Sequence, residues 1–436
     1  MMGLDTLQTG MFFCGLLLVL VALGVRVYLA AGGVGLLGLI ALIGYDPAIR
    51  LAGTIPHGST VSYSLSVLPI FILIGFLAFH AGFTAKLFEA ARRWFGWMPG
   101  GLAVASVFAS AGFAAVSGAS TATAAVFSRV AIPEMLANGY DRKLAAGVIA
   151  ASGTLATLIP PSALLVVYAI IVEQSVGRLL VAGLIPGLLS AILYAGLIVL
   201  LCVRRPELGR PLTTRYSMGA RFASLPGTFP VAAVVGIIFS AIYFGWATPT
   251  EAASVGALVV FVFALANGMR WTGLSRAILE TAKLTVMIFA LIWGVMLFVR
   301  FLGFAGIPDA VASYIVSLDV HRIWILLAIL AGYFILGAFV DAIGLLILTL
   351  PVVFPAVMAL GYDPIWFGII VVKMAELCLV TPPIGLNCFV VNGARPDIPL
   401  QDVYKGVGPF FLADFAVIAL LIVFPEIVLW LPSMMG

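Results

Sequence analysis

The chain has 436 residues, of which 63% are hydrophobic and 9% are charged, and its mean hydropathy is +1.22. A soluble domain carries about 25% charged residues, so this composition excludes a water-soluble body and indicates a polytopic helical membrane protein. The net charge of +4 is concentrated in a few polar stretches, which is not the pattern of a nucleic-acid-binding surface. The four cysteines stand singly, and the three histidines are far apart, so we expect neither a cofactor nor a transition-metal site.

Residues 1–98 predict scaffold helices followed by an arm in the membrane interface. Residues 16–43 are long enough for two short crossings interrupted near Arg26, and residues 53–64 predict a polar loop. Residues 66–81 predict a further crossing. The basic, aromatic-rich stretch 86–93 after it is typical of an amphipathic helix lying in the interface.

Residues 99–203 predict a first transport repeat. Residues 102–137 are apolar but rich in Ser, Gly, Ala and Thr, and each half is too short for a crossing of about 20 residues. They predict a re-entrant helical hairpin with its tip at residues 117–121. Residues 144–172 form one long segment broken at Pro160 and Pro161, because proline has no amide hydrogen to give to a helix.

The next crossing, residues 179–203, leads to a polar stretch with five arginines: Arg204, Arg205, Arg210, Arg215 and Arg221. Residues 204–320 predict this cytoplasmic loop, scaffold crossings at 229–244 and 252–266, a second basic linker at 270–283 and a crossing at 284–304. Residues 321–407 predict a second transport repeat, with a hairpin-like pair at 323–360 and a broken segment at 367–391. Residues 408–436 predict a C-terminal helix, from about 410 to 431.

The second half copies the first at a fixed offset. Pro355 follows Pro133, Gly361-Tyr362-Asp363 follows Gly139-Tyr140-Asp141, and Pro382-Pro383 follows Pro160-Pro161, each by 222 positions (355 − 133, 361 − 139, 382 − 160). Interrupted segments at equivalent places in two halves indicate the binding site of a secondary transporter. When the basic stretches are placed in the cytoplasm, the crossings predict that the second hairpin enters from the opposite face. The expected fold class is therefore an all-α inverted repeat with two re-entrant hairpins and two broken transmembrane helices.

Several long motifs carry a family resemblance: SGASTATAA (117–125), IPPSALL (159–165), TPTEA (248–252) and LVTPPIGLNCFVVNGA (379–394). The chain resembles the large membrane subunit of tripartite ATP-independent periplasmic (TRAP) transporters over nearly its whole length. It departs from the family pattern at residues 156–158, where many members have Gly-Pro.

The resemblance implies a sodium-coupled, elevator-type importer of organic acids, C4-dicarboxylates among them, in the cytoplasmic membrane of a bacterium. Its partners would be a small four-helix membrane subunit and a periplasmic binding protein that delivers the substrate. No enzyme activity and no cofactor beyond Na⁺ as coupling ion is expected.

Hydroxyls and freed carbonyls are the groups that hold Na⁺ in membrane transporters, and a hairpin tip offers both. A structural interpretation is also open, because small residues let helices pack closely. The candidate ion-binding residues are Ser117, Gly118, Ser120, Thr121, Asp341, Thr381, Pro382 and Gly385. The candidate substrate-binding residues are Ser152, Thr154, Pro160, Pro161, Ser162 and Asn387.

Four ionisable residues lie in apolar runs, where charge is costly and indicates function by default. Asp341 lies at the second tip and is predicted to ligate the cation or screen the substrate. Lys373 and Glu376 are three residues apart, which favours an internal ion pair. Arg300 is predicted to reach the interface or to meet an anion. Glu251 is expected to cap a helix start together with Thr250.

Other functions remain as alternatives. A stand-alone divalent-anion/sodium symporter would use the same hairpins. A channel would want a filter loop or a ring of charge. An intramembrane enzyme would need a nucleophile–base pair or a metal motif, and the sequence supplies neither.

Overall fold

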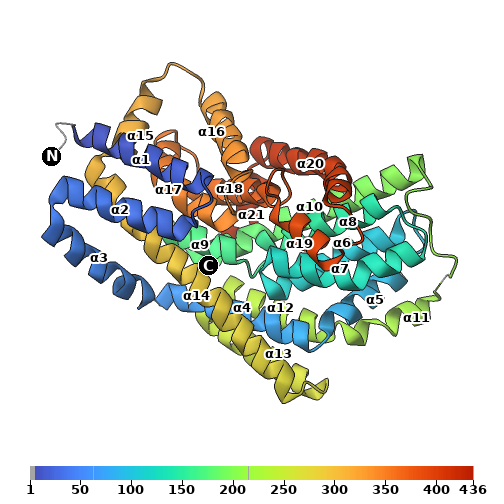
Figure 1. Ribbon diagram of the computed structural model, residues 1–436. Coiled ribbons are helices and arrows are strands. Elements are labelled where there is room, and N and C mark those ends of the chain that lie inside the picture. The colour runs from blue at the N-terminus through green and yellow to red at the C-terminus, as the bar shows by residue number, and fades with distance from the viewer. Residues whose placement is uncertain (1–4, 62, 215, 436) are drawn as a thin grey trace.

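The computed structural model describes residues 5–61, 63–214 and 216–435, and this part of the chain is built of helices joined by short connections (Figure 1). Arg215 of the arginine-rich stretch lies outside the described residues. Five of the described helices are long and apolar enough to cross a membrane, or seven if each of two bent pairs counts as one span. The expectation of a polytopic helical membrane protein is confirmed.

The N-terminal helices largely follow the prediction. The break at Arg26 is confirmed, since Arg26 is the N-cap of the second helix. The amphipathic stretch 86–93 lies in a helix that is bent by 69° from the helix before it. The elements are α1 (Thr6–Ala22), α2 (Val27–Ile43), α3 (Tyr45–Thr60), the 3₁₀ turn η1 (Tyr63–Ser66), α4 (Val67–His80) and α5 (Phe83–Phe95).

The predicted polar loop at residues 53–64 is wrong for most of its length, because α3 continues to Thr60. The hydroxyls that suggested a loop are bonded inside the helix: Thr54 donates to the Leu51 carbonyl and Thr60 to the Pro56 carbonyl. One face of α3 packs on α2 and α14. The polar residues therefore mark the other face of an amphipathic helix.

The middle of the chain holds one helix that is longer than predicted. The linker 270–283 and the crossing 284–304 form a single helix of 35 residues, α14, which is about 50 Å long at 1.5 Å per residue. No proline or helix-ending glycine separates the two parts, so the basic half simply extends the apolar one. The elements are α11 (Met218–Phe222), η3 (Leu225–Gly227), α12 (Phe229–Tyr243), α13 (Pro249–Ala266), α14 (Trp271–Ala305) and α15 (Ile307–Ser317).

The cap of α13 differs slightly from the prediction. Thr248, not Thr250, is the N-cap, and its hydroxyl accepts from the Glu251 amide while the Glu251 carboxylate accepts from the Thr248 amide. Glu251 thus caps the helix as expected.

The two repeats are visible in the helix boundaries. The first contains α6 (Gly101–Ser117), α7 (Ser120–Ala137), α8 (Arg142–Thr154), η2 (Leu155–Thr157), α9 (Ala163–Ile171) and α10 (Val176–Arg204). The second contains α16 (Arg322–Gly337), α17 (Ala342–Ala359), α18 (Pro364–Cys378), α19 (Leu386–Ala394) and α20 (Leu400–Val423), and α21 (Glu426–Ser433) follows it. Both ends of α7 and α17, and the starts of α8 and α18, differ by 222 positions (342 − 120, 359 − 137, 364 − 142).

The start of α8 and the start of α18 are also capped alike. Asp141 accepts from the amides of Lys143 and Leu144, and Asp363 accepts from those of Ile365 and Trp366. Each such cap is worth about 1 kcal/mol. The GYD motif that revealed the repeat is therefore a turn followed by an N-cap, used twice.

The C-terminal helix differs from the expected 410–431. Helix α20 begins at Leu400, ahead of the expected boundary at 407/408, and ends at Val423; Pro425 then separates it from α21. Proline at position 409 does not break α20.

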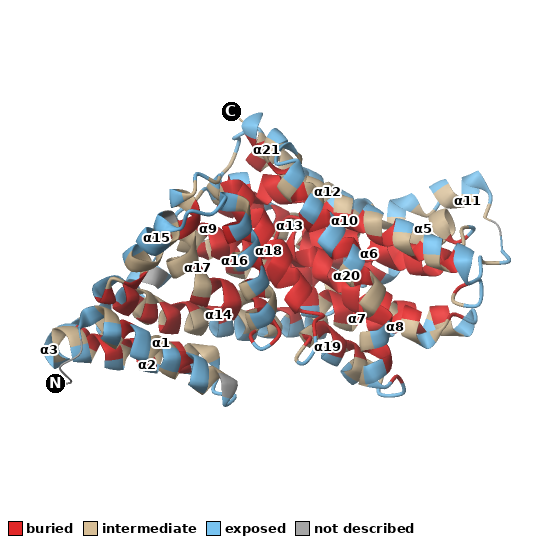
Figure 2. Cartoon of the chain, turned by 90° about the horizontal axis from the view of Figure 1, so that it is seen from above, coloured by how far each residue is buried: buried red, intermediate tan, exposed pale blue. Residues whose placement is uncertain are grey.

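The core lies where the two repeats meet. Helix α8 packs on α19 and α20, and α18 packs on α10. Every residue of α8 from Leu144 to Thr154, and every residue of α18 from Ile365 to Cys378, is buried. In Figure 2 the buried residues gather around α18, α10 and α6, whereas α1–α3 carry many exposed positions. Positions that carry charge on α18 are consequently held inside protein.

Candidate functional site

The first hairpin turns in two residues. Helix α6 ends at Ser117, Gly118 takes φ +57°, and α7 begins at Ser120. The Ser117 hydroxyl lies 3.0 Å from the Thr123 hydroxyl. Ser117 and Ser120 are buried, whereas Thr121 is exposed. The predicted helical hairpin and its tip are confirmed; its re-entrant insertion stays a prediction.

Gly118 brings the tip against the first break. A Cβ added to Gly118 would lie 2.6 Å from the Pro161 carbonyl oxygen. Only glycine allows this approach together with a left-handed backbone. The tip and the break therefore form one contiguous unit.

The first break spans residues 155–162. After α8 the chain makes a 3₁₀ turn, and α9 starts only at Ala163. Ser162 is the N-cap of α9: it accepts from the Leu165 amide and donates to the Thr157 carbonyl. Pro160, Pro161 and Ser162 are all buried. The broken helix is confirmed, and the unwound part is longer than the proline pair because residues 155–157 are already outside the α-helix.

The second hairpin and break repeat this arrangement with different side chains. Helix α16 ends at Gly337, and Asp341 is the N-cap of α17, where its carboxylate accepts from the Gly344 amide at 3.1 Å. The Ile384 amide of the second break bonds to the Ala338 carbonyl of the tip at 3.4 Å. Asp341 thus lies at the second tip as predicted, and its carboxylate holds the start of α17.

The second break spans residues 379–385. The Thr381 hydroxyl donates back to the Leu377 carbonyl, and Pro382 is exposed. Tyr404 of α20 donates its hydroxyl toward the carbonyls of Pro383 and Ile384, at 3.1 and 3.0 Å. Gly385, at φ +49°, packs against the Tyr404 ring. This tyrosine, which the sequence analysis missed, satisfies carbonyls that the break has freed.

Asn387 joins the two repeats. Its amide nitrogen donates to the Ser120 hydroxyl at 2.8 Å and to the Ala150 carbonyl at 3.1 Å. The amide oxygen is buried and has no hydrogen-bond partner in the described part of the chain. A buried, unpaired oxygen costs about 1–3 kcal/mol. It is an acceptor available to a cation or to the hydroxyl of a ligand.

The two candidate substrate-binding residues on α8, Ser152 and Thr154, bond to other helices. Ser152 donates to the Ser110 hydroxyl of α6 at 3.1 Å, and Thr154 donates to the Glu376 carboxylate at 2.7 Å. Both are buried. The structure therefore brings Ser120, Gly118, Pro161 and Asn387 together, whereas Ser152 and Thr154 face helices α6 and α18.

A buried cluster of charges ties α8, α10, α18 and α20 together. Lys373 Nζ lies 3.1 Å from Glu376 and 2.7 Å from Asp414, and the Tyr194 hydroxyl donates to Asp414 at 2.6 Å. All of these side chains are at most 2% exposed. The Lys373–Glu376 pair is confirmed. Asp414 and Tyr194 were missed, because each lies on a helix whose contact with α18 only the tertiary fold establishes.

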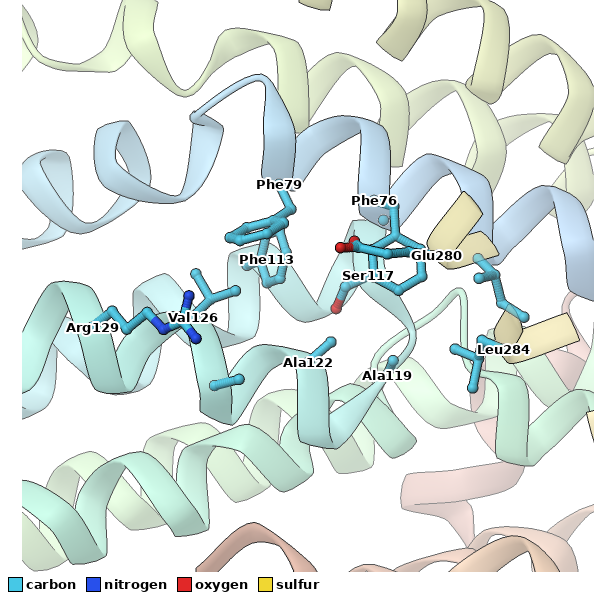
Figure 3. A pocket seen from close by; sticks show the side chains of 13 residues that line it. Phe76, Phe79, Phe113, Ser117, Ala119, Ala122, Val126, Arg129, Glu280 and Leu284 are labelled. Carbon is cyan, nitrogen blue, oxygen red and sulfur yellow. The ribbon is translucent and has the colours of Figure 1, made fainter. Parts of the chain in front are cut away.

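A cavity of about 250 Å³ lies between the first hairpin and the scaffold helices α4 and α14. Figure 3 shows Ser117 and Glu280 toward one end, Arg129 at the other, and Phe79 and Phe113 between them. Ser117 and Ala119 of the hairpin tip thus line this cavity. Arg129 was not singled out from the sequence, since it reads there as one more charge on a helix flank.

The fold and these contacts define a polytopic helical membrane protein with an internal repeat of hairpins and broken helices. The chain matches the model of the family described as tripartite ATP-independent periplasmic transporter, DctM component, over residues 14–427. It is 35% identical to a C4-dicarboxylate TRAP transporter large permease protein of Pseudomonas aeruginosa, over 92% of this chain and 94% of that one. It is 31% identical to a sialic acid TRAP transporter large permease protein of Vibrio cholerae, over 86% and 88% of the two chains.

Among solved structures, the chain resembles the YdaH transporter of Alcanivorax borkumensis, with a TM-score of 0.59, 15% identity, and coverage of 96% of this chain and 97% of that one. This likeness concerns the fold alone. The family match covers nearly the whole chain, so the chain belongs to the DctM family of TRAP transporter large permeases.

Proposed function

We propose that this permease imports an organic carboxylate through the cytoplasmic membrane of a bacterium, coupled to Na⁺ and by an elevator movement of the two repeats. The binding protein of the tripartite system would deliver the substrate, and the small membrane subunit would complete the permease. The names of the relatives include a C4-dicarboxylate, a sialic acid, isethionate and ectoine, so we propose an organic acid and no single compound.

One observation carries the proposal: Asn387 of the second repeat bonds to Ser120 at the tip of the first hairpin. The contact places the residue with an unpaired amide oxygen beside the buried Ser120 hydroxyl, and the Pro161 carbonyl lies against Gly118 of the same tip. Such oxygens are the ligands that Na⁺ takes in secondary transporters. The helix start at Ser120 adds partial positive charge that favours an anion nearby.

We infer that Ser117, Gly118, Ser120 and Thr121 form the ion site of the first repeat. Asp341, Thr381, Pro382 and Gly385 would form its counterpart in the second. The substrate would lie between them, against Asn387 and the breaks at Pro160–Ser162 and Thr381–Pro383. The buried Lys373 cluster would keep the two repeats together as one moving body.

The test is uptake by proteoliposomes that hold this chain and its small subunit, with the binding protein added outside. The binding protein is first screened by calorimetry against a panel of carboxylates, and the tightest ligand is used with a radiolabel. We expect uptake with an inward Na⁺ gradient and none with K⁺. Equal uptake in both ions would end the sodium proposal. Uptake of the same size without the binding protein would favour the stand-alone symporter.

A further inference from the structure

Arg129 of the first hairpin lines the cavity between that hairpin and helices α4 and α14, and it takes no part in the proposed ion and substrate site. It lies on α7 nine residues beyond Ser120 (129 − 120), about 14 Å along the helix. Among the described residues no carboxylate lies within ion-pair distance of it. By contrast, Arg92 and Arg93 on the neighbouring helix α5 are both paired with acids.

The other residues that line the cavity are mostly apolar, which suits the apolar part of an organic anion. Phe79 and Phe113 lie between Arg129 and the tip, and Phe76 lies beside Ser117 and Glu280 (Figure 3). Glu280 is the one acid among the lining residues, and its carboxylate lies 3.0 Å from His80 Nε2. The cation at one end is thus unpaired, while the anion at the other is engaged by a scaffold side chain.

A second cavity borders the second hairpin. A cavity of about 580 Å³ lies between α9, α14 and α17, and one residue lining it is Pro351, which stands 222 positions after Arg129 (351 − 129). Its cation comes from α14, as Arg300, which is exposed and lies beyond ion-pair distance of Glu173, the acid in the same lining. Each hairpin therefore borders one cavity lined by one arginine that has no ion-pair partner in the described part of the chain.

Helix α14 links the two cavities. It lines the first with Glu280 and Leu284 and the second with residues from Met296 to Phe304. Leu284 and Met296 are twelve residues apart (296 − 284), about 18 Å along the helix. The two cavities thus open at different depths along one scaffold helix, as the two sides of an alternating-access path must.

We propose that these cavities are paired vestibules for the transported organic anion, with Arg129 binding its carboxylate in one and Arg300 in the other. A guanidinium holds a carboxylate with two parallel hydrogen bonds, and the apolar part of the anion packs on the phenylalanines. Arg129 and Ser120 are about 14 Å apart along the axis of α7, so they lie in different turns of the helix. Arg129 would therefore bind the anion at a position separate from the central site. The inference rests on the proposed function, to which it adds where the anion binds outside the centre.

Ala122 lines the first cavity, and an Ala122→Cys variant reports the electrostatic potential that Arg129 produces there. This test does not require knowledge of the substrate. The full-length chain in detergent, with Cys14→Ala as background, is labelled with an anionic and a cationic methanethiosulfonate reagent of similar size. The readout is the ratio of the two labelling rates. We expect Arg129→Gln to lower the ratio of anionic to cationic labelling rates by about ten-fold, which is the lower end of the rate enhancement that a charged cleft gives. Arg129→Lys should keep most of the original ratio, because the positive charge remains.

The matched control is Arg276→Gln, an exposed arginine of α14 that lines neither cavity. An unchanged ratio in Arg129→Gln would overturn the inference, and so would an equal fall in Arg276→Gln, because the effect would then be general surface charge. This readout is independent of uptake. Failure of Na⁺-driven uptake in the parent chain would remove the proposed function, whereas intact uptake with an unchanged labelling ratio would remove only the vestibule.

Discussion

Thr154 donates a hydrogen bond of 2.7 Å to Glu376, and the two residues are 222 positions apart, which is the offset of the repeat. Equivalent positions of the two halves therefore meet inside the protein. The first copy has a hydroxyl at this position and the second has a carboxylate. Lys373 corresponds to Ala151 (373 − 222), so its charge has no counterpart in the first half. The charged cluster exists because the two repeats differ at the place where they touch.

The cluster predicts a large stability effect. Lys373→Met leaves Glu376 and Asp414 buried without their cation, and breaking a buried pair costs about 3–5 kcal/mol. We expect a clearly lower thermal midpoint in detergent, and partial recovery when Glu376→Gln and Asp414→Asn are added, because the remaining groups are then neutral. Arg395→Met, which breaks the more exposed pair with Asp397, should cost less than about 1 kcal/mol. Equal effects of the two single changes would show that the cluster does not hold the repeats together.

The hydroxyls at the first tip predict an effect on sodium. In Ser120→Ala, Asn387 loses one of its two hydrogen-bond partners and the ion site loses an oxygen; each such loss is worth about 1 kcal/mol. We expect the Na⁺ concentration for half-maximal uptake to rise about five- to ten-fold, and Thr121→Ala to act in the same direction. Ser128→Ala is the control on the same helix, since that hydroxyl bonds only to the Ala124 carbonyl. Unchanged Na⁺ dependence in both tip variants would place the ion elsewhere.

Gly118 and Gly139 both have a left-handed backbone, so a comparison of their alanine variants separates the effect of backbone strain from the effect of a steric clash. A Cβ at Gly118 would meet the Pro161 carbonyl at 2.6 Å, whereas one at Gly139 would meet nothing within 4 Å. Both Gly118→Ala and Gly139→Ala strain the backbone by about 1 kcal/mol. Only Gly118→Ala should push the tip off the break and reduce the initial uptake rate by an order of magnitude or more, since about 1.4 kcal/mol corresponds to ten-fold. Equal rates in the two variants, at matched expression, would contradict the tip–break unit.

Local sequence signals predicted the hairpins and the breaks. Paired prolines cannot continue a helix, and the GYD motif combines a turn with a cap, so these elements follow from nearby residues alone. The repeat added a second, independent copy of each signal. Composition was a poorer guide for α3 and α14, where polar residues suggested a loop and a linker. There the polar side chains belong to one face or one half of a continuous helix, which composition does not distinguish from an interruption.

The candidate site was predicted in part. Asn387 and Ser120 were both singled out from the sequence, but they are 267 positions apart, and no local sequence pattern predicts their contact. The sequence analysis missed Asp414, Tyr194 and Tyr404 for the same reason, because their hydrogen-bond partners lie in other elements of the fold. Arg129 was visible as a charge, but its importance depends on the cavity and on the absence of an acid within ion-pair distance in the described part of the chain.

The most direct test of the account is an experimental density map of the full complex in sodium buffer, compared with one in potassium buffer. We predict a cation peak that contacts oxygens of residues 117–121 and of the first break, present in sodium and absent in potassium. A sodium map that resolves these side chains, yet has no such peak while uptake still depends on Na⁺, would contradict the claim that hairpin tips and broken helices form the ion site.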